Sequence, residues 1–290
     1  MPSQTRVSAV TVNYNARDHL VACIRSLRDD GVEEVVVVDN ASSDGSLDAA
    51  GRADPAAVLV PTGGNLGFGA AANRGLAVAS GEYVVVMNPD VVVEPGTMKV
   101  LVDAADRHPR LAVLGPRVEN PDGTFYPSAR TFPDLLEAAG HAFLGFVAPD
   151  NRFSRSYRML DWDHSTPRHV DWVSGTCMLL RPAALAETGA FDEGYFMYVE
   201  DVDLCWRLWQ SGWEVGYEPA GRVVHTIGAS SEQAPYRMIL AHHRSLFRFS
   251  VKTTRGPRSL LLPLVAVALA VRTVLAWLQR ARRGLPHAAL

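Results

Sequence analysis

The chain has 290 residues, of which 48% are hydrophobic and 20% charged, and its formal net charge is −3. This composition excludes a disordered chain and suits one large domain, or a domain with an appendage. The lack of a positive net charge argues against nucleic acid as a partner. Three widely spaced cysteines without a C-x-x-C motif indicate a reducing compartment. We therefore expect a cytoplasmic protein, and no cleavable signal peptide precedes the first strand-like segment.

Strand and helix patterns alternate over the first hundred residues. Apolar runs at 7–12, 35–38 and 83–87 are typical of buried parallel strands, and segments with helical spacing, including one over about 70–80, separate them. We therefore expect an α/β fold, with a doubly wound, mainly parallel sheet flanked by helices.

Polar residues follow three of these strands. Pro89 cannot donate a ladder hydrogen bond, so the strand in VVVMNPDVVV should end at Asn88. Ligands of open α/β sheets bind at the carboxyl ends of the strands, so we expect the three ends to line one crevice. The polar residues are Asn13, Tyr14 and Asn15 after the first strand, Asp39 and Asn40 after the second, and Asn88 and Asp90 after the third.

A glycine-rich turn, GNLGFGAAANRG, leads into the helix expected over about 70–80. Backbone amides at Gly67 and Gly69, together with the helix dipole, suit a diphosphate ligand. Asn65 and Asn73 add donors that a merely tight turn would not need, although a tight turn is the simpler interpretation.

The pattern is irregular over about 119–168, which we interpret as an excursion across the face that carries the site. A strand and a helix start follow, and then the run YVEDVD opens a helix with one apolar face. Its acids Glu200, Asp201 and Asp203 suit either helix capping or catalysis. A strand pair, EVGYEP and GRVVHT, should close the domain.

The order of these motifs resembles the family 2 inverting nucleotide-sugar glycosyltransferases, which have the GT-A fold. The resemblance implies a catalytic domain over 1–230, with a donor half of about 1–115 and an acceptor half of about 116–230. Within the family the chain is similar to rhamnosyltransferases that act on polyprenyl-diphospho-N-acetylglucosamine in the arabinogalactan linker. This implies transfer of L-rhamnose from dTDP-rhamnose, and a UDP-sugar donor or an O-antigen or capsule acceptor is the alternative.

The resemblance also implies roles for the acids and for one histidine. NPD stands in the place of the family's D-x-D motif, so Asp90, with His225, would bind a Mg²⁺ or Mn²⁺ ion that bridges the donor phosphates. Asp201 would be the general base, and Glu200 would orient the acceptor or tune that base. We expect Asp203 and Arg207 to be helix-surface or structural residues.

The donor and acceptor sites follow from the same resemblance. Asp39, assisted by Asp44, would accept the imide N–H of a pyrimidine base. The donor set comprises Asn13, Tyr14, Asn15, Asp39, Asn40, Asp44, Asn65, Gly67, Gly69, Asn73 and Asn88. Trp172, Gly175 and Thr176 are expected on the acceptor side, although Trp172 suits a buried core position equally well.

A helical extension is expected over 231–290, and its residues 260–278 are almost continuously apolar. Basic residues flank this stretch on both sides, which favours a helix lying on the anionic inner face of the cell membrane over an oriented span. Packing on the catalytic domain, or in a homo-oligomer, is the alternative.

Two other classes of protein compete with a glycosyltransferase. A nucleotidyltransferase would need a glycine-rich nucleotide loop directly after the first strand, where this chain has NYNARD instead. A non-catalytic sugar-nucleotide-binding protein would not need metal-like, base-like and acceptor-like positions together.

Overall fold

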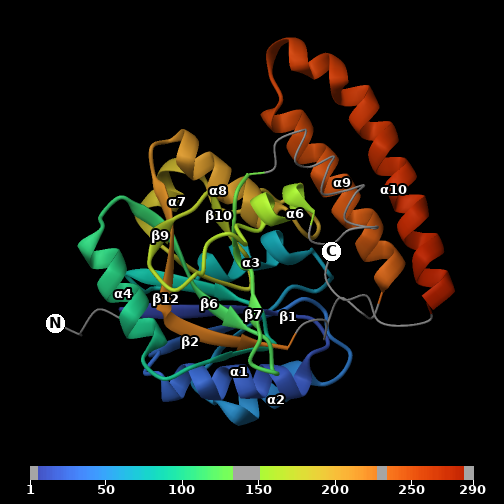
Figure 1. Cartoon of the computed structure of the whole chain (residues 1–290). Coiled ribbons are helices and arrows are strands. Elements are labelled where there is room, and N and C mark those ends of the chain that lie inside the picture. The colour runs from blue at the N-terminus through green and yellow to red at the C-terminus, as the bar shows by residue number, and fades with distance from the viewer. Residues whose placement is uncertain (1–5, 133–150, 227–233, 284–290) are drawn as a thin grey trace.

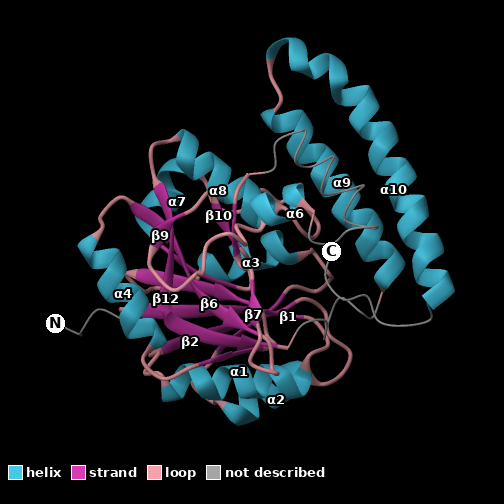
Figure 2. Cartoon of the chain, in the orientation of Figure 1, coloured by secondary structure: helices cyan, strands magenta, loops and turns pink. Residues whose placement is uncertain are grey.

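The computed structural model describes residues 6–132, 151–226 and 234–283. Of Arg282 and Arg283 it describes only the backbone. Helices cover both sides of a central sheet, and a helical hairpin, α9 (Pro235–Thr253) and α10 (Leu262–Arg283), stands beside it (Figures 1 and 2). The expected α/β fold is confirmed.

The central sheet is mixed but mainly parallel. In spatial order its main strands are β3 (Val58–Pro61), β2 (Glu34–Asp39), β1 (Val7–Asn13), β4 (Tyr83–Met87), β11 (Cys177–Leu180), β6 (Leu111–Glu119), β12 (Glu214–His225) and β5 (Val91–Val93). Strands β3, β2, β1 and β4 are parallel, β11 is antiparallel to β4 and β6, and β5 is antiparallel to β12. The shorter strands are β7 (Phe125–Tyr126) on β6, β9 (Arg168–His169) on β12, and the separate pair β8 (Ala129–Arg130) and β10 (Trp172–Val173).

Each central strand buries side chains on both faces, as the valine-rich sequences predict. Val36 and Val38 of β2 belong to one apolar cluster, and Val35 and Val37 belong to the other. Alternate residues of a strand point to opposite faces, so helices must cover both. Helices α1 (Arg17–Asp29), α2 (Ser46–Ala53) and α4 (Thr97–Arg107) cover one face, and α3 (Phe68–Leu76), α7 (Pro182–Thr188) and α8 (Glu200–Gln210) cover the other.

Three boundaries differ from those expected. The helix placed at about 70–80 is α3, which begins at Phe68 and ends at Leu76. The expected strand pair after Glu214 is one long strand, β12, whose pairing with β6 shifts register between Glu218 and Arg222. The sequence indicated that Pro219 would end the first of the two strands. A β-bulge can accommodate a proline without ending the strand, and β12 therefore continues past Pro219.

The two expected halves of the catalytic domain share this one sheet. The boundary near residue 115 falls within β6, and β11 and β12 of the later half lie between strands of the earlier half. Within the irregular region, α6 (Arg152–Tyr157) and short strands are described, and residues 133–150 lie outside the described residues.

The extension is bound to the catalytic domain through α9. Phe249 of α9 is 5% exposed and belongs to the same apolar cluster as Phe68 and Val202. A short 3₁₀ turn, η2 (Gly256–Leu261), connects α9 to α10. The first helix of the extension is therefore part of the catalytic core.

Candidate active site

The ends of β1 and β2 meet as the sequence predicts. Asn13 and Asp39 are register partners, and Asn13 Nδ2 donates to Asp39 Oδ1 at 2.9 Å. The amide of Ser42 donates to the other carboxylate oxygen at 3.0 Å. Asn13 Oδ1 is buried without a hydrogen-bond partner among the described residues. The pair therefore offers acceptor groups to a ligand N–H.

Neighbouring donor-set residues shape the loops around this pair. Asn15 has a positive φ of 50° and accepts from the Ser43 amide at 2.7 Å, and half-buried Tyr14 precedes it. Asp44 accepts from the backbone amides of Arg17 and Ser46, which places it at the start of α2. In this geometry Asp44 orders the loop before α2. Its expected role in binding the pyrimidine base of the donor stays a prediction.

The glycine-rich turn is held by side chains and by a close approach of two loops. Asn40 Nδ2 donates to Asn65 Oδ1 at 3.1 Å, and the Gly67 amide donates to the same oxygen at 3.1 Å. The Phe68 amide donates to the Phe196 carbonyl. The amides of Gly67 and Phe68 thus have partners within the chain, and the expected diphosphate cradle at Gly67 and Gly69 stays a prediction.

Gly69 and Asn73 of α3 contact α8 and the segment that precedes it. A Cβ on Gly69 would lie 3.1 Å from Phe191 and 3.6 Å from Glu200. Asn73 exchanges two hydrogen bonds with the Phe191 backbone, at 2.9 and 3.0 Å. The Asn73 side chain therefore anchors this loop, and its expected contact with the donor stays a prediction.

Asp90 and His225 lie together, at the end of the NPD segment and at the end of β12. His225 Nε2 lies 3.1 Å from Asp90 Oδ1, and both side chains are nearly buried. The contact has the distance of an ion pair without the angles of a hydrogen bond, so Asp90 Oδ1 has no hydrogen-bond partner among the described residues. Asn88 Nδ2 lies 3.4 Å from the same imidazole nitrogen.

These groups fit the expected divalent ion. A carboxylate oxygen and an imidazole nitrogen that converge without a shared hydrogen bond suit Mg²⁺ or Mn²⁺, and water and phosphate oxygens would complete the shell. Within the described ranges no group of three or more His, Cys, Asp or Glu side chains is arranged to hold a metal. The protein would thus provide few ligands itself.

The acids Glu200 and Asp201 begin α8 after two strained residues. Tyr198 and Val199 both have positive φ, 67° and 70°, which is rare for non-glycine residues and costly for a β-branched one. Glu200 is 5% exposed, whereas Asp201 is partly exposed. The strained turn thus places a buried glutamate directly before a partly exposed aspartate.

Burial raises the pKa of Glu200, and the adjacent Asp201 carboxylate raises it further. Burial also raises the pKa of Asp201, while hydrogen bonds from the Gly175 and Val202 amides and the charge of Arg130 act in the opposite direction. Asp201 therefore ionises more readily than Glu200. The two amides and Arg130 thus favour the charged form of Asp201, whereas burial and the neighbouring carboxylate disfavour the charged form of Glu200.

The expected acceptor residues Gly175 and Thr176 lie between Asp201 and the NPD segment. The Gly175 amide donates to Asp201 Oδ2 at 2.8 Å, and the Asn88 amide donates to the Thr176 carbonyl at 3.0 Å. Trp172 is 5% exposed and donates from its indole to the Thr131 carbonyl. Its packing favours the core position that the sequence left open over a sugar-stacking role.

Arg130 is a site residue that sequence reasoning missed. Its guanidinium lies over the rings of Tyr126, Tyr157 and Trp172, at 5.8, 5.6 and 5.1 Å from their centres. The Tyr126 ring in turn contacts the His225 ring edge to face, with centres 6.3 Å apart. Arg130 lies within an irregular region, where periodicity gives no signal, and only its aromatic neighbours in FYPSARTF hint at it.

Acidic groups at the carboxyl ends of a mainly parallel sheet are typical of an α/β enzyme that binds its ligand in that crevice. Residues 8–188 match the family model described as glycosyl transferase family 2. The chain belongs to this family and is a glycosyltransferase with the GT-A fold. The expectation drawn from the motifs is confirmed.

Two relatives of this chain are named as rhamnosyltransferases. The chain is 41% identical over 253 residues to the N-acetylglucosaminyl-diphospho-decaprenol L-rhamnosyltransferase of Mycobacterium tuberculosis, covering 83% of this chain and 82% of that one. It is 25% identical over 258 residues to the rhamnosyltransferase WbbL of Escherichia coli, covering 84% and 92%.

Solved structures support the fold. A mannosyltransferase from Pyrobaculum calidifontis, solved with GDP-Man and Mn²⁺, matches with a TM-score of 0.60 at 18% identity, over 98% of this chain and 77% of that one. GalNAc-T7, solved with UDP, GalNAc and Mn²⁺, matches with a TM-score of 0.57 at 15% identity, over 76% of this chain and 43% of that one.

Proposed function

We propose that this protein transfers L-rhamnose from dTDP-rhamnose, with inversion, to a lipid-linked N-acetylglucosaminyl diphosphate in cell-wall polysaccharide synthesis. The observation that carries the chemistry is the carboxylate of partly exposed Asp201, held by the Gly175 and Val202 amides at the start of α8. The 41% identity to the mycobacterial rhamnosyltransferase supports the donor sugar and the acceptor.

Asp201 acts as the general base in this proposal. It takes the proton of the acceptor hydroxyl as that oxygen attacks the anomeric carbon, and the bond to the nucleoside diphosphate breaks on the opposite face of the sugar. Two backbone amides fix the carboxylate without removing its charge. Glu200 stays protonated beside it, so the second acid contributes no competing negative charge.

Asp90 and His225 would hold the divalent ion that the donor diphosphate needs. The ion, when bound, neutralises charge that builds on the departing phosphates. Asn88 replaces the first acid of the family motif, so the protein contributes one carboxylate here instead of two. We therefore infer weaker binding of the free ion than of the ion together with the donor diphosphate.

The acceptor is met at a membrane surface. Among the described helices, η2 and α10 together form one stretch, Gly256–Ala281, long and apolar enough to cross a bilayer. A stripe of exposed residues, spaced by three or four, runs along α10: Leu264, Val267, Val271, Val274 and Leu278. Exposed Arg255 and Arg258 lie where the stretch begins. We infer that this stripe lies on the anionic inner face of the cell membrane.

A transfer assay tests this proposal. Purified protein with Mn²⁺ is given dTDP-rhamnose, UDP-glucose or UDP-galactose, together with a short-chain N-acetylglucosaminyl-diphospho-lipid. We expect a rhamnosylated lipid from dTDP-rhamnose alone. Transfer from a UDP-sugar would instead support the alternative of another family 2 activity. Donor hydrolysis with no transfer to this acceptor would contradict the proposed acceptor.

A further inference from the structure

Asp203 is a fully buried carboxylate on the first turn of α8, two residues after the proposed base. Its Oδ1 accepts from the Tyr195 hydroxyl at 3.2 Å, and its Oδ2 accepts from Arg207 Nε at 2.8 Å. Its exposed fraction is 0%. A buried carboxylate needs such partners in place of the water that it has lost. The same contacts hold Asp203, and with it the first turn of α8, in position.

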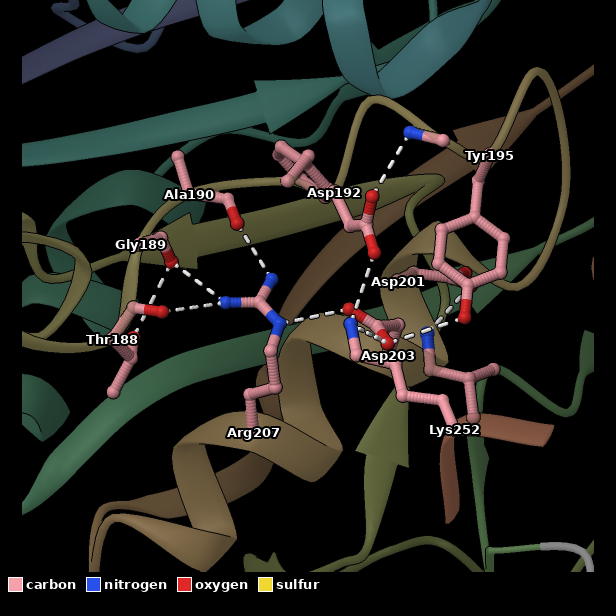
Figure 3. A network of polar contacts seen from close by, with 12 residues as sticks. Thr188, Gly189, Ala190, Asp192, Tyr195, Asp201, Asp203, Arg207 and Lys252 are labelled. Atoms are coloured by element: carbon pink, nitrogen blue, oxygen red, sulfur yellow. Dashed lines mark hydrogen bonds and ion pairs between the residues drawn. The ribbon is translucent and has the colours of Figure 1, made fainter. Parts of the chain in front are cut away.

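Lys252 reaches the same carboxylate from the C-terminal extension. Its ammonium lies 2.6 Å from Asp203 Oδ1 and 3.0 Å from Asp192 Oδ2. Figure 3 shows Arg207 and Lys252 approaching Asp203 from opposite sides. Lys252 is on α9, so a residue of the extension neutralises an acid inside the catalytic helix.

The network also fixes the loop that precedes the catalytic helix. Arg207 donates to the carbonyls of Thr188, Gly189 and Ala190, at 2.8, 3.0 and 2.6 Å. Asp192 accepts from Arg248 of α9 as well as from Lys252. The loop, α8 and α9 are thus joined through two carboxylates.

Helix α9 also contacts the strained turn directly. Ser245 donates to the Met197 carbonyl at 2.9 Å, and the ring of His242 lies 5.1 Å from the ring of Tyr198. Tyr198 and Val199 keep their positive φ only if surrounding contacts hold them. Those contacts come partly from α9, and their release would let the first turn of α8 relax.

We propose that Lys252 is a positioning residue for the reaction, acting through Asp203 to hold the first turn of α8 and with it the carboxylate of Asp201. The C-terminal extension is then a structural part of the active site as well as a membrane contact. This inference rests on the proposed role of Asp201 as the base.

The test compares Lys252→Met with three matched variants. Lys252→Arg keeps the charge, and Arg248→Met removes a cation from Asp192 while leaving Asp203 paired. Lys99→Met removes an exposed pair with Asp103 on α4, far along the chain from α8. If circular dichroism shows Lys252→Met unfolded, Lys252→Gln takes its place, because it also removes the positive charge while its polar amide costs less to place beside two carboxylates.

In folded Lys252→Met we expect kcat to fall by about 10- to 100-fold, the range that a small misplacement of a catalytic group costs. The KM for the donor should change by less than about twofold, because no donor contact is removed. Lys252→Arg should recover most of kcat, Arg248→Met should lose less of kcat than Lys252→Met, and Lys99→Met should stay near wild type.

Hydrogen exchange measures the same coupling without using activity. Amides of residues 195–205 should exchange faster in Lys252→Met and unchanged in Lys99→Met. Wild-type kcat together with wild-type exchange in folded Lys252→Met, or in Lys252→Gln where it replaces that variant, would overturn the inference. Full activity of Asp201→Asn would sink the proposed base instead, and the exchange result would still report whether Lys252 holds the turn.

Discussion

Glu200 and Asp201 are adjacent acids that their surroundings make unequal. Glu200 points into the core beside Gly69, and its Oε2 has no hydrogen-bond partner among the described residues. Asp201 receives two backbone amides. Acids placed in such different environments take different protonation states, which is how neighbouring carboxyl groups acquire different roles.

The raised pKa of Glu200, about 8, predicts how stability depends on pH. Between the ordinary range of a glutamate and this value, the native protein keeps a proton that the unfolded chain has released. The free energy of unfolding should therefore fall as pH rises through this window, by at most about 1.4 kcal/mol per pH unit.

Urea denaturation between pH 5 and pH 9, on wild type and Glu200→Gln, measures this dependence. The glutamine variant should lose most of the decline, because it carries no titratable proton. Identical pH dependence in the two proteins would show that Glu200 is already ionised in the native state.

The metal pair gives a second prediction at this scale. Asp90→Ala and His225→Ala each remove a proposed ligand, so each should raise the Mn²⁺ or Mg²⁺ concentration needed for half-maximal transfer. Asp103→Ala, which removes an exposed carboxylate on α4, is the control. A wild-type protein that remains fully active in EDTA would show that these residues do not hold a catalytic metal.

At the scale of elements, α3 and the segment before α8 approach each other at a glycine. Gly67 has a φ of +86°, and a Cβ there would lie 2.1 Å from the Phe196 carbonyl oxygen. Because the two backbones lie so close, the Phe68 amide donates a hydrogen bond to the Phe196 carbonyl. This bond joins the glycine-rich turn to the loop that precedes α8. The glycine is therefore required by backbone contact as well as by conformation.

Gly67→Ala should destabilise the protein by more than Gly63→Ala. Gly63 lies in the same turn with a φ of +75°, yet a methyl group added there would meet nothing within 4 Å. Both variants carry the cost of a positive φ, and only Gly67→Ala adds a clash, worth roughly 1–3 kcal/mol. Equal losses of unfolding free energy in the two variants, measured by urea denaturation, would show that the loops at Gly67 and Phe196 can move apart at no cost in stability.

For the whole molecule, the extension has two parts with different surroundings. Helix α9 is bound to the core through Phe249 and Lys252, whereas α10 packs on α9 and leaves its apolar stripe exposed. Donor, metal and base positions all precede residue 226. A truncation near Gly256 therefore keeps the site and the Lys252 contact, and removes the stripe.

This truncated chain should keep donor binding. Its binding to anionic vesicles should fall and become less sensitive to salt, because apolar and basic contacts are lost together. Transfer to a full polyprenyl-diphosphate sugar should fall more than transfer to a short water-soluble analogue. Equal loss on both acceptors, with unfolding seen by circular dichroism, would show instead that α10 stabilises the fold or an oligomer.

The sequence predicted local features well and distant contacts poorly. Strand ends at Asn13, Asp39 and Asn88 could be located, because hydrophobic runs and Pro89 are local signals. The continuity of β12 was missed, because a bulge tolerates Pro219. The contact between Lys252 and Asp203 joins residues about fifty positions apart, and no periodicity marks such a pair. The hydrogen bond from the Phe68 amide to the Phe196 carbonyl is likewise a contact between distant parts of the chain.

The central claim is that Asp201 is the base of an inverting rhamnosyl transfer. The most direct measurement is single-turnover transfer from dTDP-rhamnose by wild type and Asp201→Asn, with donor binding measured in parallel and the product's anomeric configuration assigned by NMR. We expect an inverted product, and a rate in Asp201→Asn lower by roughly 10²- to 10⁴-fold with donor affinity unchanged. A retained configuration, or a near wild-type rate in the variant, would contradict the account.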